Sequence, residues 1–510
     1  MSDKPVRVRF APSPTGPLHI GGVRTALYNY LFAKKNKGTF ILRIEDTDQT
    51  RFVEGAEEYL IESLKWCGIM PTEGQGIGGN YGPYKQSERK EMYMPYAEEL
   101  VKNDKAYYAF DTAEELDFMR EQAKKMNMPN WQYNAITRSS MKNSTTLPED
   151  EVERRLANGD PYVIRFKMPR NEDVRFEDII RGWVVVNTNN LDDKVLYKSD
   201  GMPTYHLANI VDDKTMEISH VIRGEEWLPS APLHVLLYEA FGWEAPKFAH
   251  LPLLLRPDGN GKLSKRDGDR LGFPVFPLDW FTAEGEKYSG YRERGYLPNA
   301  FINMLAFLGW NPGTTQEIFT LDDMVEAFSL ERVSKSGAKF DAQKTNWFQQ
   351  QYLRAESNGS LASMLRKKEG EQLKSVSETY LETACGLMKE RATFVEDIYN
   401  EGRYLFENPT HFDKEAIQKK WKEDTTQIMK DWIEVLRSAT PFDAAHLESS
   451  FHTFLEEKEL NVGKVLFPFR LVLTGASAGP SMFEISVLLG KEEVLKRMEG
   501  NLAIIDKIKG

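Results

Sequence analysis

The segment PSPTGP places three prolines between residues 12 and 17, directly after the first apolar stretch of the chain. Proline fixes φ, lacks an amide donor and biases the preceding residue toward an extended backbone. We therefore expect residues 11–18 to form a rigid, extended loop between a strand at 6–10 and a helix at 21–37. The free N–H groups at the start of that helix would favour an anion such as a phosphate.

Strand and helix patterns continue to alternate after this loop. A second strand at residues 39–44 and a second helix at 54–67 are typical of a parallel sheet in an α/β domain. From residue 107 to 195 the helical periodicity weakens and new strand patterns appear, which we interpret as an α+β insertion. The α/β alternation resumes near Lys198, and beyond about residue 321 the pattern is almost entirely helical.

The composition excludes several classes of protein. The chain of 510 residues carries a net charge of −11, which argues against indiscriminate nucleic-acid binding but leaves room for a local basic track. No apolar run approaches the ~18 residues of a membrane helix and the start lacks a signal core, so we expect a cytoplasmic chain with no membrane partner. The two cysteines, Cys67 and Cys385, form neither a disulfide framework nor a zinc motif.

The end of the proline loop carries the first specific motif. His19 directly precedes the expected helix, where its ring can donate hydrogen bonds to phosphate oxygens, and Gly21 and Gly22 allow a ligand to approach the backbone. The stretch APSPTGPLHIGG resembles the "HIGH" signature of the class I aminoacyl-tRNA synthetases, and its APSPTG portion resembles the glutamyl/glutaminyl branch. Gly22 stands in the fourth signature position in place of histidine, so the resemblance leaves the histidine chemistry to His19.

A second, basic motif lies downstream in DGNGKLSKRD, residues 258–267. Glycine flexibility together with concentrated positive charge suits a mobile clamp on a polyphosphate. The run KLSKR, residues 262–266, resembles the "KMSKS" signature of the same enzyme class and follows the first signature in the expected order. The resemblance makes Lys265 a second catalytic residue beside His19.

Polar residues at the predicted strand ends suit a dicarboxylate with one ammonium group. Arg9, Glu45 and Arg223 each end a predicted strand at the carboxyl edge, where α/β sheets bind ligands. Arginine recognises carboxylates through its rigid fork, and the ammonium needs a carboxylate. By resemblance to the glutamyl synthetases, the glutamate-binding set is Arg9, Ala11, Ser13, Glu45, Tyr205, Asn209 and Arg223. By the same resemblance, the ATP-binding set is Thr15, His19, Gly21, Glu226, Trp227, Lys262, Ser264, Lys265 and Arg266.

The resemblance to bacterial-type glutamyl-tRNA synthetases covers essentially the whole chain and implies both a fold and a reaction. The fold would be a Rossmann-like class I synthetase catalytic domain with an α+β insertion, followed by an all-α anticodon-binding region. The reaction would join glutamate to ATP as glutamyl-adenylate, release pyrophosphate and transfer glutamate to the 3′ end of tRNA(Glu). The implied ligands are L-glutamate, ATP with its Mg²⁺ and tRNA(Glu), and the implied assembly is a monomer.

The resemblance also divides the chain into five segments. Residues 1–106 and 196–256 would be the two halves of the catalytic domain, and the insertion at 107–195 would bind the acceptor stem. Residues 257–342 would contain the KMSKS-like loop and a stem-contact domain. Residues 343–510 would form the helical anticodon-binding domain.

The helical C-terminal pattern favours the glutamyl over the glutaminyl assignment, because the glutaminyl enzymes have β-barrels in this region. Residues 468–490, PFRLVLTGASAGPSMFEISVLLG, resemble the C-terminal signature of the glutamyl family. Arg391 falls where relatives use an arginine to contact the anticodon. Residues 267–295 form a longer segment than the family pattern has there, and we assign no function to them.

Three further patterns are interpreted as structural. Some relatives hold zinc in the insertion, but no cysteine or histidine occurs between Cys67 and His206, so we expect no structural zinc there and no protein-bound metal. GQGIGG at residues 74–79 fits a dinucleotide-binding pattern, but its flanks favour a plain loop. The remaining histidines are interpreted as packing or surface residues: His220, His234, His250, His411, His446 and His452.

Three alternatives stay open at this point. A non-discriminating glutamyl enzyme would also charge tRNA(Gln), and the sequence does not distinguish it. A paralogue that glutamylates a modified tRNA base would lack the helical C-terminal region. A non-catalytic tRNA-binding relative would have lost His19 or Lys265, and both are present.

Overall fold

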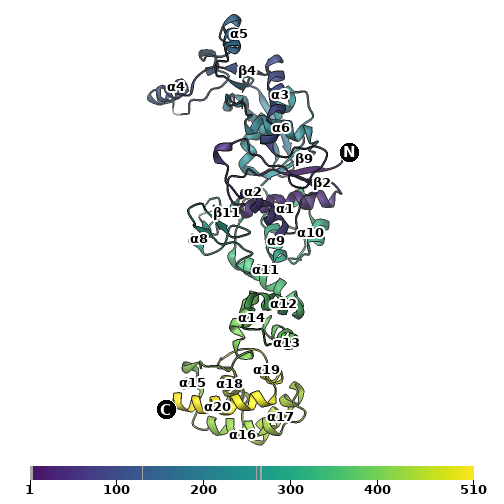
Figure 1. Cartoon of the computed structure of the whole chain (residues 1–510), viewed down its shortest axis with the longest axis vertical. Coiled ribbons are helices and arrows are strands. Elements are labelled where there is room, and N and C mark those ends of the chain that lie inside the picture. The colour runs from purple at the N-terminus through teal and green to yellow at the C-terminus, as the bar shows by residue number, and fades with distance from the viewer. Residues whose placement is uncertain (1–3, 129, 260, 265–266, 510) are drawn as a thin grey trace. The chain divides into compact units, whose positions relative to one another are not determined.

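The structure is a computed structural model that describes residues 4–128, 130–259, 261–264 and 267–509. The chain divides into two compact units, which Figure 1 shows in colours that follow the residue number. The first, here called the α/β unit, comprises Met1–Arg294 and Phe301–Ala342. The second, here called the helical unit, comprises Gly295–Ala300 and Gln343–Gly510.

The first sheet of the α/β unit forms around the proline loop. Its strands β1 (Arg7–Phe10), β2 (Thr39–Leu42) and β3 (Glu73–Gly74) are parallel in that order. Helix α1 (Ile20–Lys35) connects β1 to β2, and α2 (Ala56–Trp66) follows β2. The predicted order of strand, helix, strand and helix is confirmed, and α1 begins at Ile20, one residue earlier than expected.

A second sheet supplies the neighbouring strand ends. Its order is β7-β6-β10-β9, with the bounds Gly182–Asn187, Asp173–Asp178, Lys247–Leu251 and His220–Gly224. Strands β6, β10 and β9 are parallel, and β7 returns antiparallel to β6. Ser219 connects this sheet to β1, because its N–H donates to the Arg7 carbonyl at 2.9 Å and its hydroxyl accepts from the Arg7 N–H at 2.8 Å.

Helices α3 (Lys90–Lys102), α6 (Tyr205–Thr215) and α7 (Ala231–Ala240) share one hydrophobic core with the second sheet. A separate antiparallel sheet within the predicted insertion has the order β4-β5-β8, with the bounds Ala106–Ala109, Val163–Phe166 and Val195–Tyr197. This part also contains α4 (Ala113–Lys125) and α5 (Glu149–Asn158). The predicted α+β character is confirmed, although β6 and β7 of the same stretch of chain belong to the sheet that contains β10.

Short elements follow β10 along the chain. They are β11 (Leu254–Leu255), α8 (Asp267–Leu271), β12 (Trp280–Phe281), β13 (Lys287–Tyr288), α9 (Pro298–Ala306), α10 (Leu321–Ala327) and β14 (Ala338–Lys339). Strand β11 pairs in parallel with β14, and β12 pairs antiparallel with β13.

Within its described residues, the helical unit contains helices and no strands, as predicted. Its helices are α11 (Ala342–Ala355), α12 (Asn358–Glu369), α13 (Glu378–Met388), α14 (Val395–Glu401), α15 (Lys414–Lys420), α16 (Thr425–Ser438), α17 (Ala444–Glu457), α18 (Val462–Thr474), α19 (Met482–Leu489) and α20 (Lys491–Lys509). At the centre of their core Trp432 packs against Phe451, Phe454 and Phe469, with ring centroids 5.4–5.7 Å apart. Aromatic side chains of this size bury the apolar area that holds the bundle together.

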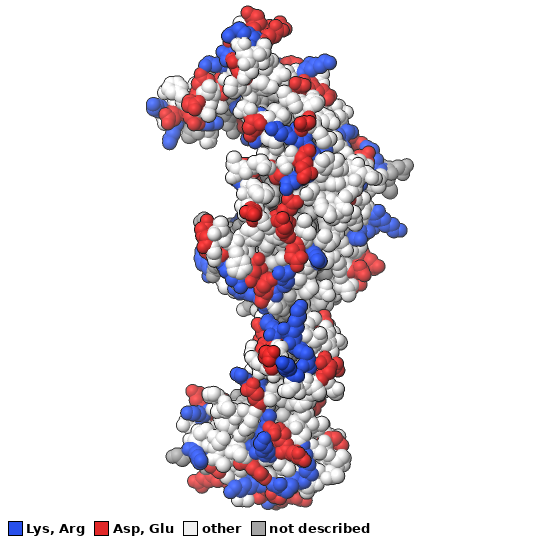
Figure 2. Space-filling model, in the orientation of Figure 1, with Lys and Arg blue, Asp and Glu red and all other residues white. Residues whose placement is uncertain are grey.

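Figure 2 shows basic and acidic side chains interspersed over the visible face of each unit. This mixture agrees with a chain whose nucleic-acid binding would be local and not general. Among the described residues, no helix combines the length and the apolar character that crossing a membrane requires.

The GQGIGG stretch begins in β3 and continues as a turn. Gly74 and Gln75 donate backbone hydrogen bonds of 2.9 Å to the carbonyls of Gly78 and Leu42. The next helical segment in the described chain is a 3₁₀ turn at Gln86–Arg89, so the stretch does not open a helix as a dinucleotide motif must. The predicted plain loop is therefore right for residues 75–79 and wrong for Gly74, which belongs to a strand.

We predict that Gly74→Ala destabilises the α/β unit by about 3 kcal/mol. A Cβ atom at residue 74 would lie 2.2 Å from the Leu42 carbonyl oxygen, and the φ of +128° is one that side chains with a Cβ rarely adopt. Gly68→Ala is the matched control, because Gly68 has a φ of +70° but nothing within 4 Å of the added carbon; it should cost about 1 kcal/mol. Urea unfolding followed by circular dichroism measures both, and equal losses would contradict the steric explanation.

Candidate functional site

Backbone contacts from neighbouring segments hold the proline loop. The carbonyl of Pro12 accepts from the Glu45 N–H, and the carbonyl of Pro14 accepts from the Val53 N–H, both at 3.0 Å. The expectation of an extended backbone through Leu18 is wrong in one part, because residues 15–17 form a bend. Gly16 makes this bend possible with a φ of +131°, which glycine adopts without a steric penalty. The loop carries Ala11, Ser13 and Thr15 of the predicted site.

His19 is the N-cap residue of α1. Its Nδ1 accepts a hydrogen bond of 3.1 Å from the Gly21 N–H. In a neutral imidazole only one nitrogen carries a proton, so this contact assigns the proton to Nε2. His19 can therefore donate from Nε2 to a phosphate oxygen, as the sequence predicts.

The other backbone N–H groups at the start of α1 already have acceptors. The Ile20 N–H donates to the Val275 carbonyl at 3.0 Å, and the N–H groups of Gly22 and Val23 donate to the His19 carbonyl at 2.8 and 3.1 Å. The expected anion site of free N–H groups is therefore wrong in this detail. A phosphate at this helix would therefore have to be bound through the His19 side chain and the helix dipole.

Gly22, which stands where the signature has histidine, has little room for a side chain. A Cβ atom at residue 22 would lie 2.5 Å from Cδ1 of Leu18 and 3.8 Å from the Phe10 ring. A histidine there would have to displace Leu18, which is buried. The local packing thus favours glycine at this position.

The long segment at residues 267–295 packs against the first signature. The Phe276 ring meets the His19 imidazole edge-on, with centroids 6.1 Å apart and an interplanar angle of 86°. Leu278 exchanges two hydrogen bonds with the Tyr59 hydroxyl, which donates to its carbonyl at 2.6 Å and accepts from its N–H at 3.1 Å. The segment is therefore an ordered neighbour of His19, which the sequence did not reveal.

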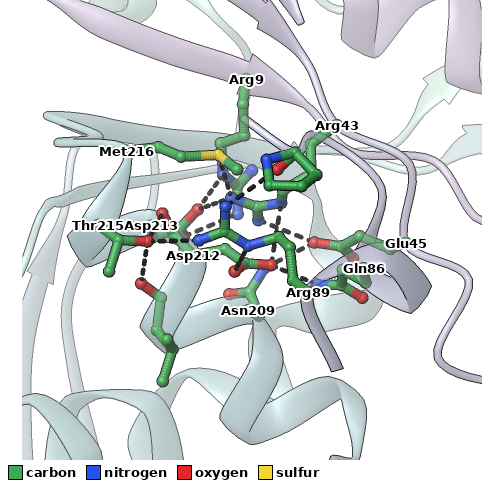
Figure 3. A network of polar contacts seen from close by, with 12 residues as sticks. Arg9, Arg43, Glu45, Gln86, Arg89, Asn209, Asp212, Asp213, Thr215 and Met216 are labelled. Atoms are coloured by element: carbon green, nitrogen blue, oxygen red, sulfur yellow. Dashed lines mark hydrogen bonds and ion pairs between the residues drawn. The ribbon is translucent and has the colours of Figure 1, made fainter. Parts of the chain in front are cut away.

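A buried network of ion pairs lies at the carboxyl ends of β1 and β2 (Figure 3). Arg9 donates from Nε and Nη2 to both oxygens of Asp213, at 2.9 and 3.1 Å. Arg43 donates from Nη1 to Asp213 and from Nη2 to Glu45, both at 2.8 Å. Burial opposes ionisation of Asp213, but the two guanidinium groups hold its pKa below the usual value. The charge of Arg9 is thus already balanced within the protein.

The neighbouring residue Asp212 extends this network. It accepts from Arg89 Nε at 2.8 Å, from Gln86 Nε2 at 2.9 Å and from the Tyr93 hydroxyl at 3.0 Å. Burial raises the pKa of Asp212, although Arg43 and Arg89 both oppose the rise. Asp212 and Asp213, both near the end of α6, therefore connect this helix to three segments that are distant in the sequence.

Glu45 and Asn209 meet at the edge of this network. Asn209 Nδ2 donates to Glu45 Oε1 at 3.2 Å, and the same oxygen accepts from Arg43. Arg9, Glu45 and Asn209 of the predicted glutamate set thus belong to one connected cluster (Figure 3).

Arg223 has surroundings of a different kind. Its Nη1 donates to the Tyr205 hydroxyl at 3.0 Å and lies 3.3 Å from His234 Nδ1, and its Nε donates to His250 Nε2 at 3.0 Å. Its Nη2 lies 3.5 Å from the Trp227 carbonyl. Burial lowers the pKa of His234 well below its usual value and that of His250 to about 4, and it raises the pKa of Tyr205. All the described partners of this buried arginine are therefore neutral.

One of the predicted ATP-binding residues, Trp227, contacts this cluster. The Trp227 ring packs on the Tyr205 ring, with centroids 4.4 Å apart. Lys262 Nζ lies 3.3 Å from Glu226 Oε1, so the basic loop and the segment after β9 meet. Ser264 donates from its N–H and its hydroxyl to Asp267 Oδ2, at 2.8 and 2.7 Å. Lys265 and Arg266 lie outside the described residues.

Arg391 belongs to the helical unit, where it follows α13. Its Nη2 donates to the Gly479 carbonyl at 2.8 Å, and the residue is exposed. It lines a hollow of about 620 Å³ together with Glu382, Glu390 and Glu484. An exposed arginine in such a hollow can contact a single-stranded base.

Sequence reasoning missed the partners that hold the predicted residues. Arg43 stands between apolar residues in ILRI, and Asp213 closes the run IVDD, which are signals for buried ion pairs. His234 and His250 carry no such local signal, because their role depends on β9, β10 and α7 meeting in space.

Comparisons with known proteins show the family to which the chain belongs. Residues 5–347 match the family model for the catalytic domain of class I tRNA synthetases (E and Q), and residues 360–502 match an anticodon binding domain. A glutamate–tRNA ligase of Amoebophilus asiaticus is 55% identical over 506 residues, 99% of each chain. One of Cytophaga hutchinsonii is 56% identical over 505 residues, 98% of each chain.

A solved structure shares the fold. The crystal structure of a glutamate tRNA ligase from Elizabethkingia meningosepticum in complex with its amino acid has a TM-score of 0.94 and 53% sequence identity. The match covers 98% of this chain and 100% of that one. The predicted class of fold, an α/β unit with an insertion followed by a helical region, is confirmed.

We predict that Asp213→Asn destabilises the α/β unit by about 3 kcal/mol, because it leaves two buried guanidinium groups without their shared counter-charge. The folded-state pKa of Asp213 lies below its usual value, so its stabilising effect is present above pH ~4 and is lost as the pH falls further. The loss of unfolding free energy in the variant should therefore be full at pH 7 and shrink below pH ~4. Urea unfolding at a series of pH values measures it, and a pH-independent loss would contradict the ionic explanation.

Proposed function

Because this chain belongs to the class I tRNA synthetases as a glutamate–tRNA ligase, we propose that the cluster around Arg223 binds glutamate and that ATP lies between His19 and the Lys262 loop. The enzyme activates glutamate with ATP as glutamyl-adenylate, which releases pyrophosphate, and then transfers the glutamate to tRNA, which releases AMP.

The neutral surroundings of Arg223 carry the proposal for the amino-acid site. Arg223 is 5% exposed, and its described hydrogen-bond partners are a hydroxyl, two imidazoles and a carbonyl. A buried cation is costly unless a negative charge balances it. A carboxylate of bound glutamate would supply that charge, and the fork of the guanidinium suits it.

Arg9 differs from Arg223 because Asp213 already balances it. We therefore assign Arg223, together with the Tyr205 hydroxyl, the main interaction with a substrate carboxylate. Arg9, Asn209 and Ala11 would complete the walls of the pocket, while Glu45 and Ser13 would face the ammonium group.

Catalysis would depend on positioning and on charge stabilisation, because neither step needs a side-chain nucleophile. A glutamate carboxylate attacks the α-phosphate, and the His19 Nε2–H would donate to a phosphate oxygen there. Lys262 and Lys265 would stabilise the departing pyrophosphate. ATP would bring its own Mg²⁺, bound mainly through phosphate oxygens. Thr15, Gly21, Glu226, Trp227, Ser264 and Arg266 would line the remainder of the ATP site.

The helical unit would bind the anticodon of tRNA(Glu), since residues 360–502 match an anticodon binding domain. Arg391 would contact an anticodon base from the hollow that it lines. With a net charge of −11, the chain should bind tRNA through local contacts whose affinity falls steeply with salt. The five segments, the monomeric state and the cytoplasmic location stay predictions from the sequence.

Aminoacylation of purified tRNA(Glu) and tRNA(Gln) with labelled glutamate and labelled glutamine tests the function directly. We expect glutamate to be attached to tRNA(Glu) and glutamine to neither tRNA, because the pocket presents an unbalanced positive charge. Attachment of glutamate to tRNA(Gln) as well would identify the non-discriminating alternative. No charging of either tRNA would contradict the proposed function and favour the non-catalytic relative.

We predict that Arg223→Lys raises the KM for glutamate about 100-fold, because lysine keeps the charge but loses the fork that binds a carboxylate. The KM for ATP should stay within about a factor of three. Arg175→Lys is the matched control, since Arg175 is an exposed arginine on β6 whose partner is the exposed Asp173. Steady-state aminoacylation at varied glutamate measures the effect, and an unchanged KM for glutamate would refute the assignment of Arg223.

A further inference from the structure

Asp178, His250 and Arg223 form a buried series of contacts behind the proposed amino-acid site. We propose that Asp178 and His250 are a positioning pair that fixes the guanidinium of Arg223 for binding glutamate. This inference rests on the proposed role of Arg223 and assigns two residues that do not themselves touch the substrate.

The sheet brings the three residues together. Strand β10 lies between β6 and β9, and the three strands are parallel. His250 of β10 is the register partner of Arg223 on β9, and Asp178 is the last residue of β6. The series therefore crosses three neighbouring strands near their carboxyl ends.

Asp178 fixes the tautomer of His250. Its Oδ2 lies 2.6 Å from His250 Nδ1 and accepts from the His250 backbone N–H at 3.1 Å. Its Oδ1 accepts from the N–H groups of Ile180 and Arg181 at 3.0 and 2.8 Å. A carboxylate held by so many donors is an acceptor, so the imidazole must carry its proton on Nδ1.

With its proton on Nδ1, His250 presents a lone pair at Nε2. Arg223 Nε donates to it at 3.0 Å. Burial lowers the pKa of His250 to about 4, so the ring is neutral at pH 7 and does not repel the guanidinium. Both His250 and Asp178 are buried, so water does not compete for these hydrogen bonds.

The Asp178–His250 pair orients Arg223 without placing a carboxylate in direct contact with it. A carboxylate in contact with Arg223 would balance its charge and compete with the carboxylate of the substrate, as Asp213 does at Arg9. The imidazole keeps Asp178 one side chain away, so the charge of Arg223 is supported but not neutralised. Because Nε is occupied, the plane of the guanidinium is set, with Nη1 against the Tyr205 hydroxyl and Nη2 against the Trp227 carbonyl.

Asp178→Asn, His250→Ala and His250→Gln in the full chain test the proposal, together with Arg223→Lys. In Asp178→Asn, the new side-chain amide would donate toward Nδ1 of the imidazole and favour the other tautomer, which places two N–H groups against each other at Arg223.

We expect Asp178→Asn and His250→Ala to raise the KM for glutamate about tenfold, with the KM for ATP unchanged. His250→Gln restores an acceptor and should stay within about threefold of wild type. Asp173→Asn, at the exposed start of the same strand, is the control and should change neither KM.

The outcomes separate this inference from the proposed function. If Arg223→Lys raises the KM for glutamate but Asp178→Asn and His250→Ala do not, the positioning pair is refuted and the role of Arg223 stands. If Arg223→Lys has no effect either, the proposed function of Arg223 fails first. Equal increases in the KM for glutamate and for ATP, or no rescue by His250→Gln, would indicate general damage and refute the pair. Should Asp178→Asn fail to fold, the contrast between His250→Ala and His250→Gln decides.

Discussion

The ion pairs of Asp212 and Asp213 hold helix α6 against the carboxyl ends of β1 and β2. These adjacent residues near the end of α6 accept hydrogen bonds from Arg9, Arg43 and Arg89, which belong to three separate segments. Charges as buried as these are tolerated only when every partner is in place. Helix α6 can therefore dock against β1 and β2 in one position. Tyr205 and Asn209 of the proposed amino-acid site lie on the first turns of the same helix and take their places from this docking.

Two buried arginines near the carboxyl ends of the strands, Arg9 and Arg223, differ in whether a carboxylate balances their charge. Arg9 is balanced by Asp213, whereas Arg223 has only neutral partners among the described residues. Both side chains are buried, so the difference comes from the partner and not from exposure. A protein that builds its scaffold from balanced charges can leave one cation unbalanced where a ligand is to complete it. In the proposed site, the two arginines thus differ in charge balance and not in burial.

Much of this arrangement could be predicted from local patterns. The alternation of strands and helices, the helical C-terminal region and the cap position of His19 all follow from residues close together in the sequence. The partners that orient Arg223 could not be predicted, because His250 meets it only through the pairing of β9 and β10. The packing of residues 267–295 against His19 could not be predicted either. Their contact with His19 depends on how a segment without a strong pattern folds back over α1.

The contact between residues 267–295 and the start of α1 limits how the first signature can bind an anion. A helix N-terminus usually binds an anion through its unsatisfied N–H groups. In α1 the Ile20 N–H is taken by the Val275 carbonyl, and the next three N–H groups are taken by His19 itself. The backbone of this first turn therefore contributes its dipole but no free donor, and in the proposed site the direct hydrogen bond to phosphate would come from Nε2 of the imidazole. Because Phe276 packs edge-on against that ring, the orientation of this donor depends on a segment far along the chain from the first signature.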